Sequence, residues 1–143
     1  MSAPVFVDTN VLLYAADTAA EAKHRAASLW RAELWRSRRG RVSFQVLQEF
    51  YVQSTRASRT DAISHGQAAG LVEAWCRFPV QVMSVEVMRA ALATRSRFGI
   101  SYWDAAIIEA GRALGCSVVL SEDLDDATDY DGIRVEDPFR LAA

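Results

Sequence analysis

Four acidic residues stand beside apolar segments of this chain, and their carboxylates are its best candidates for chemistry. Asp8 ends the first strongly apolar run, and Asp123 closely follows another. Glu49 and Asp104 lie within stretches of helical periodicity. Carboxylates gathered at one place raise each other's pKa values, so they coexist most easily around a cation. The four residues therefore indicate a cation-dependent site if the fold brings them together.

The residue types also indicate which cation and which reaction. Oxygen ligands without nearby His or Cys favour Mg²⁺ or Mn²⁺ over zinc. His24 and His65 are isolated in the sequence, so neither a His-based metal site nor a His general base is expected. A Mg²⁺ ion held by carboxylates keeps several waters, accepts phosphate oxygens and lowers the pKa of a bound water. The chemistry predicted is hydrolysis of a phosphodiester.

Each acid taken alone also has a structural interpretation. Asp104 completes the pattern Ser101-x-x-Asp104, which resembles a helix capping box. Glu49 is typical of a solvated helix acid, Asp123 of a turn residue, and Asp8 of a helix cap. The conjunction of the four is what favours a functional site.

The elements expected around these acids place them at one edge of a sheet. The expected strands are 4–8, 41–44, 80–83, 116–120 and 133–135. The expected helices are 11–16, 19–39 ended by Gly40, 46–55, 61–76 capped by Thr60 or Asp61, 85–98 after Ser84, and 102–114 after Ser101. Strands that alternate with helices predict an α/β fold with a covered parallel sheet, whose strands end at a common edge. The acidic segment 122–131 is expected to be a loop.

The composition is that of an ordinary globular chain. Its 143 residues fit one domain, residues 1–143, and 51% are hydrophobic. No apolar run approaches the roughly 20 residues of a membrane span, and no signal peptide is evident. Cys76 and Cys116 lie in apolar segments without metal-ligand spacing, which predicts buried free thiols in a reducing compartment and a cytoplasmic protein.

Four short motifs resemble those of a known family. In chain order they are Val7-Asp8-Thr9-Asn10-Val11-Leu12, Glu49-Phe50, Tyr102-Trp103-Asp104-Ala105-Ala106-Ile107 and Leu120-Ser121-Glu122-Asp123-Leu124. They are similar to the motifs of PIN domains, and most similar to those of the VapC-type toxins of bacterial toxin–antitoxin pairs. The resemblance implies a three-layer α/β/α fold around a parallel sheet with strand order 3-2-1-4-5. In that order the first and fourth strands are neighbours, so Asp8 and Asp123 meet.

The resemblance also implies roles for individual residues. The family's acidic quartet corresponds to Asp8, Glu49, Asp104 and Asp123. Asp8 and Asp104 are expected to do most of the metal holding, while Asp123 and Glu49 bind metal-bound waters or a second metal and orient the attacking water. The family's polar supporting positions correspond to Thr9, Asn10 and Ser121. Asp125 fills a slot two residues after the last motif acid, where members with the Ser-Glu-Asp-Leu form often lack an acid.

The function implied is that of a Mg²⁺- or Mn²⁺-dependent endoribonuclease acting as a toxin. The implied partners are RNA, a cognate antitoxin whose C-terminal segment crosses the acidic groove, and a second copy in a homodimer. Arg56 and Arg59, which follow the helical segment bearing Glu49, are candidates for holding RNA phosphates. Trp103 has two interpretations, base stacking and core packing, of which core packing is favoured.

Three other kinds of protein compete with this interpretation. Phosphatases of the haloacid dehalogenase type need a second acid two residues after the first, and position 10 is Asn. Receiver-type phosphoacceptors need a Lys near the end of a late strand, and the only lysine is Lys23 in the second helical segment. A non-catalytic interaction module with the same fold remains the third possibility, which the four intact acids disfavour.

Overall fold

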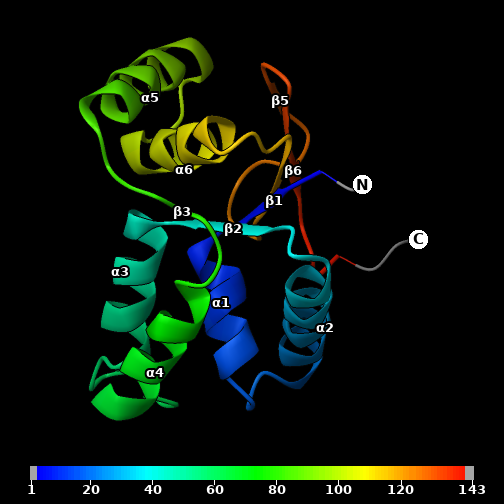
Figure 1. Ribbon diagram of the computed structural model, residues 1–143, viewed down its shortest axis with the longest axis vertical. Coiled ribbons are helices and arrows are strands. Elements are labelled where there is room, and N and C mark those ends of the chain that lie inside the picture. The colour runs from blue at the N-terminus through cyan, green and yellow to red at the C-terminus, as the bar shows by residue number, and fades with distance from the viewer. Residues whose placement is uncertain (1–2, 141–143) are drawn as a thin grey trace.

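The computed structural model describes residues 3–140 and contains one six-stranded sheet in the order β3-β2-β1-β4-β6-β5 (Figure 1). All neighbouring strands are parallel except β5 and β6. The strands are β1 (Val5–Val7), β2 (Gly40–Ser43), β3 (Val80–Gln81), β4 (Val118–Leu120), β5 (Asp129–Tyr130) and β6 (Ile133–Glu136). The predicted order 3-2-1-4-5 is confirmed, with β6 as its fifth strand. β5 is an additional short strand within the segment expected to be a loop.

Helices cover both faces of the sheet and complete the predicted three-layer α/β/α arrangement (Figure 1). One face carries α1 (Thr9–Ala16), α2 (Glu21–Ser37), α3 (Phe44–Ser54) and α4 (His65–Trp75). The other face carries α5 (Val85–Phe98) and α6 (Tyr102–Ala113). Within residues 3–140, no helix is both long and apolar enough to cross a bilayer.

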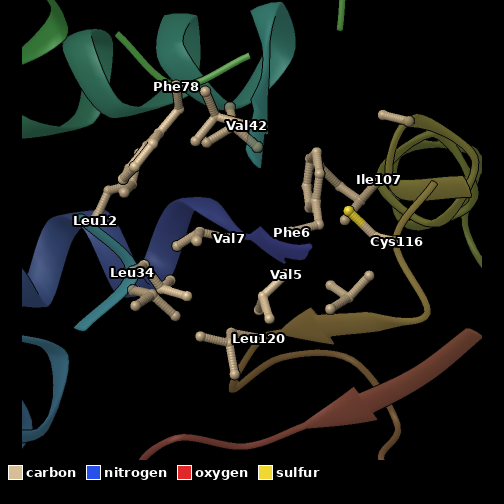
Figure 2. Close-up of a cluster of buried hydrophobic side chains, with 14 of the residues drawn as sticks. Val5, Phe6, Val7, Leu12, Leu34, Val42, Phe78, Ile107, Cys116 and Leu120 are labelled. Atoms are coloured by element: carbon tan, nitrogen blue, oxygen red, sulfur yellow. The ribbon is translucent and has the colours of Figure 1, made fainter. Parts of the chain in front are cut away.

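The apolar run of β1 is continuous because the strand is buried on both faces. Figure 2 shows Phe6 beside Ile107 and Cys116, on the α6 side, while Val7 lies on the side of Leu12 and Leu34. The close packing of α6 on β1 continues at Gly111, where a Cβ would lie 3.3 Å from the Phe6 Cβ. Burial of these side chains fixes the position of β1 between the two helix layers. It therefore also fixes the position of Asp8, the residue that follows the strand.

Several helix ends differ from the sequence prediction, and two of them have clear local causes. The fourth helix begins at His65, not at 61, because Ser64 and Gln67 form a reciprocal capping box that satisfies its first N–H groups. The second helix ends at Ser37, and Arg38, not Gly40, adopts the left-handed conformation with φ 59°. Cys116 is buried as predicted, but Cys76 is exposed at the end of α4, so the prediction of two buried thiols was wrong for Cys76.

Gly40 is instead required by packing at the start of β2. A Cβ at this position would lie 2.6 Å from the Phe78 ring, which is itself buried. We expect Gly40→Ala to lower the free energy of unfolding by about 1–3 kcal/mol through overpacking. Gly70→Ala, in the interior of α4 where a Cβ meets open space, is the control and should raise it by up to about 1 kcal/mol. Equal urea midpoints for Gly40→Ala and the parent would contradict this account.

Candidate active site at the carboxyl edge of the sheet

The register between β1 and β4 brings the two strand-end acids to the same edge. Val7 pairs with Leu120, and the Asp8 N–H donates to the Leu120 carbonyl at 3.0 Å. The residues after these strands, Asp8 and Ser121, therefore lie side by side. The predicted meeting of the first and fourth strands is what places Asp123 near Asp8.

A hydrogen-bond network centred on Asn10 joins these residues. Its Nδ2 lies 3.4 Å from Asp8 Oδ2 and 3.3 Å from Asp123 Oδ2, and it donates to both carboxylates. Its Oδ1 accepts from the Glu122 N–H at 3.1 Å. The Ser121 hydroxyl donates to Asp8 Oδ2 at 2.7 Å and accepts from the Asp123 N–H. One amide side chain thus holds two carboxylates and the loop between them.

All four predicted acids line a single pocket of about 140 Å³. Asp8 reaches it from the end of β1, Glu49 from α3, Asp104 from α6 and Asp123 from the loop after β4. The full lining is Asp8, Thr9, Asn10, Leu13, Gln45, Glu49, Gln53, Trp103, Asp104, Ile107 and Asp123. In the part of the chain that the structure describes, this lining contains neither Lys nor Arg.

Three helices begin at this pocket. Asp8 caps α1 by accepting from the Thr9 N–H at 2.7 Å, and Ser43 caps α3 through the Val46 N–H. Ser101 caps α6 by accepting from the Asp104 N–H at 3.1 Å. The positive ends of the three helix dipoles face the acids and offset part of their repulsion. The cap interpretation of Asp8 is therefore confirmed, and the same residue also lines the pocket.

Burial makes Asp8 the most perturbed of these acids. The residue is 8% exposed, and loss of hydration raises its pKa from 3.8 to about 6. The hydrogen bonds from Ser121 and Thr9 lower the pKa, while the negative charges of Glu49 and Asp123 raise it further. In the absence of a cation, the pocket therefore resists full ionisation of Asp8.

Ser121→Ala tests this balance directly. Removing the hydroxyl that favours the charged carboxylate should raise the pKa of Asp8 above its present value of about 6. Carbon-13 NMR titration of the side-chain carboxyl in metal-free protein measures the change. Asp125 is the internal reference, because its pKa is held low by the Ala127 N–H and the Thr128 hydroxyl and should not move. An unchanged Asp8 titration would show that the hydrogen bond from Ser121 does not affect the pKa of Asp8.

The family model of the PIN domain matches residues 5–132. The chain belongs to the PIN domain family. Comparison with curated proteins finds no significant match.

Solved structures of similar fold agree with this assignment. A chain of the FitAB complex bound to an IR36 DNA fragment has a TM-score of 0.72 at 14% identity, covering 97% of this chain and 98% of that chain. A toxin–antitoxin complex from Klebsiella pneumoniae gives 0.68 at 20% identity, with coverages of 98% and 100%. Mycobacterium tuberculosis VapC20, a sarcin–ricin loop cleaving toxin, gives 0.61 at 22% identity, with coverages of 83% and 89%. At these identities the likeness shows the shared fold.

The donor set of this PIN domain fits a hard divalent cation. The acids supply only oxygen, and a cation among them would relieve the cost of ionising the buried Asp8. Over residues 3–140, however, no three His, Cys, Asp or Glu side chains lie close enough together to form a ready-made metal cage. Mg²⁺ needs no such cage, because it is bound through one or two carboxylates and keeps several of its waters.

Three of the other predicted residues lie outside the pocket of this PIN domain. The Asp125 carboxylate is engaged in its own turn, with the Ala127 N–H and the Thr128 hydroxyl. Arg56 is exposed just beyond α3, and Arg59 pairs with Asp17 at 3.5 Å beyond the end of α1. Thr9, Asn10 and Ser121 do lie at the acids, as the resemblance implied.

Sequence reasoning also misjudged or missed residues that face the pocket. Trp103 is 63% exposed at its lip, so core packing was the wrong choice between the two interpretations. Gln45 and Gln53 were not singled out, although they stand four residues before and after Glu49. Helical spacing places all three on one face, and that signal was available once Glu49 had been chosen.

Proposed function

We propose that this PIN domain is a Mg²⁺- or Mn²⁺-dependent endoribonuclease that serves as the toxin of a toxin–antitoxin pair. The observation that carries the proposal is the convergence of Asp8, Glu49, Asp104 and Asp123, from four separate elements, on one pocket. A surplus of carboxylates with no basic residue among the described lining suits cation-assisted chemistry on a phosphate better than direct binding of the phosphate by the protein.

In the proposed mechanism, Asp8, Asp104 and Asp123 would hold the cation. When bound, it supplies a water of lowered pKa and neutralises charge that builds up on the phosphate. Glu49 would orient the attacking water and accept its proton as the water oxygen attacks phosphorus, while the P–O bond to the departing nucleotide breaks and its oxygen takes a proton from solvent. Asn10 and Ser121 keep Asp8 and Asp123 at fixed positions through their hydrogen bonds. Arg56 and Arg59, beyond the pocket, hold phosphates further along the RNA.

The toxin part of the proposal is supported by the motif resemblance and by the solved structures of similar fold, several of which are toxin–antitoxin complexes. Free nuclease activity would harm its host, so a cognate antitoxin is the partner expected. An all-acidic pocket attracts a basic side chain, and that is the means by which such a partner would cover it. The homodimer stays a prediction that rests on the family resemblance.

Incubation of the pure protein with RNA tests the proposal. Cleavage is expected with Mg²⁺ or Mn²⁺, and EDTA should abolish it. Asp8→Asn should be inactive under every condition, while Asp61→Asn, which removes an exposed acid in the loop before α4, should be fully active. Metal-independent binding of RNA that is equal in the parent and Asp8→Asn, without cleavage, would instead support the non-catalytic module.

A further inference from the structure

The pocket that holds the four acids has a second chemical character. Besides the carboxylates, its lining contains the amides of Gln45 and Gln53 and the indole of Trp103. With no Lys or Arg among the described lining residues, the protein itself offers a polyanion no charge attraction there. The amides and the indole are suited instead to contacts with the base or sugar of a nucleotide.

Trp103 presents a large aromatic surface at the lip of this pocket. It is the second residue of α6, directly before Asp104, and it is 63% exposed. Its ring stands edge-to-face on Tyr102, with the ring centroids 5.1 Å apart and an interplanar angle of 77°. That contact supports the indole from one side and leaves the rest of its surface to solvent. Burying an exposed ring of this size on a ligand is favourable, and a nucleobase has the matching flat face.

Gln45 places a polar side chain in the pocket beside Trp103. Its side chain is only 8% exposed, and it lines the acidic pocket from the first turn of α3. Within residues 3–140, its amide is not among the buried polar groups left without a partner, so it is open to the pocket and available to a ligand. A Gln amide offers both a donor and an acceptor to a base edge.

We propose that Trp103 and Gln45 form a nucleobase subsite beside the four acids, in which the base stacks on the indole and its edge binds the Gln45 amide. The inference rests on the proposed ribonuclease function and adds to it the two residues that receive a base. A base can reach such a site only when it is unpaired and unstacked, so the substrate is single-stranded or looped RNA. The base supplies the affinity that the acidic lining denies to the phosphates.

The stacking half is tested by binding rather than by turnover. Fluorescently labelled single-stranded oligoribonucleotides are titrated into Asp8→Asn protein with Mg²⁺, so that no RNA is cleaved, and fluorescence anisotropy gives Kd. Adding Trp103→Ala should raise Kd by about 5- to 100-fold, and Trp103→Phe should retain most of the affinity. Phe44→Ala is the matched control, because Phe44 is also an exposed aromatic at a helix start but lines the apolar groove between α3 and α4. Equal Kd values for Trp103→Ala and Phe44→Ala would overturn the proposal.

The base-reading half is tested by preference among bases. Oligomers of adenosine, cytidine and uridine are compared in the same assay, and one of them should bind best. Gln45→Leu should reduce the ratio between the best and the worst Kd by about 5- to 100-fold. Gln48→Leu is the control, because Gln48 faces the α3–α4 groove instead. Equal binding of the three oligomers by the parent, or an unchanged ratio in Gln45→Leu, would remove Gln45 from the subsite.

These measurements separate the two proposals. If the wild-type protein fails to cleave RNA with any metal while the Trp103 and Gln45 effects on binding hold, the nuclease function is wrong and the nucleobase site stands. If cleavage occurs and substitution of neither Trp103 nor Gln45 changes RNA binding, the nuclease function stands and the subsite is wrong. Circular dichroism of each variant establishes that it is folded. An oligomer with abasic positions tests stacking in protein that keeps Trp103.

Discussion

Replacing Asp8 by Asn is expected to lower kcat/KM for RNA cleavage by about a thousand-fold or more and, at the same time, to stabilise the metal-free protein at neutral pH. The loss of activity follows from removing the most buried carboxylate of the proposed cation site, where a preorganised charge is worth about 10²–10³ in rate. Asn preserves the shape of the side chain and can still accept the Thr9 N–H at the start of α1. The fold should therefore persist.

The gain in stability follows from the pKa of Asp8. The folded state raises this pKa from 3.8 to about 6, so ionising the side chain within the fold costs about 3 kcal/mol more than ionising it in the unfolded chain. Because the folded pKa is the higher one, the stabilising contribution is fully present below pH 3.8 and is lost as the pH rises through 6. At pH 7 the wild-type protein bears the whole cost, whereas Asp8→Asn carries no charge to ionise.

Urea unfolding in EDTA at pH 4.5 and pH 7 checks this prediction through the difference between the two proteins. The stability of Asp8→Asn relative to wild type should increase by about 2 kcal/mol between these pH values, because about 1 kcal/mol of the total cost is already present at pH 4.5. Mg²⁺ should stabilise the wild type more than the variant, by about 2.7 kcal/mol at a hundred times its Kd. Asp61→Asn is the control and should track the wild type. A variant that is less stable than wild type at pH 7 would show that the Asp8 charge is already compensated in the metal-free fold.

The sequence was sufficient to locate the acids because their positions follow from strand ends. Asp8 ends a run buried on both faces, and Asp123 follows the neighbouring parallel strand, so register alone brings them to one edge. Asp104 was placed by the Ser101 cap, which fixes the first residue of α6. The positions of these acids and the strand order thus follow from local signals in the sequence, namely strand ends and helix caps.

Features that depend on tertiary packing were harder to predict. Trp103 is apolar and stands next to buried positions of α6, so burial was the natural expectation, yet its place in the first turn leaves it beyond the edge of the sheet. The start of α4 was missed because three candidate caps, Thr60, Asp61 and Ser64, lie within five residues. Only Ser64 has Gln67 at the right spacing to close a capping box. The short β5 depends on pairing with β6, which its own two residues do not signal.

Asn10→Asp is expected to have the second-largest effect, because a nearly isosteric change turns a donor into a fifth negative charge. The Asn10 Nδ2 lies within 3.4 Å of oxygens from both Asp8 and Asp123. Two unit charges at about 4 Å repel by about 4 kcal/mol at an effective dielectric constant near 20, so the new carboxyl will hold a proton well above its ordinary pKa. In metal-free protein at pH 7 we expect a loss of about 2–4 kcal/mol in unfolding free energy, with kcat/KM reduced by about 10- to 100-fold.

The pH dependence and a second substitution distinguish charge from lost geometry. Asn10→Ala removes the same hydrogen bonds without adding a charge, so its cost of about 1–3 kcal/mol should be similar at pH 4.5 and pH 7, measured relative to wild type by urea unfolding. The additional cost of Asn10→Asp should appear only as the pH rises above about 4, where the unfolded chain ionises. Asp8→Asn in the same chain should recover most of that stability, since it removes one of the two repelling carboxylates, but it should not recover cleavage. If the double variant is as unstable as Asn10→Asp alone, the damage lies in the Glu122 loop that Asn10 holds, and the repulsion between carboxylates is not its cause.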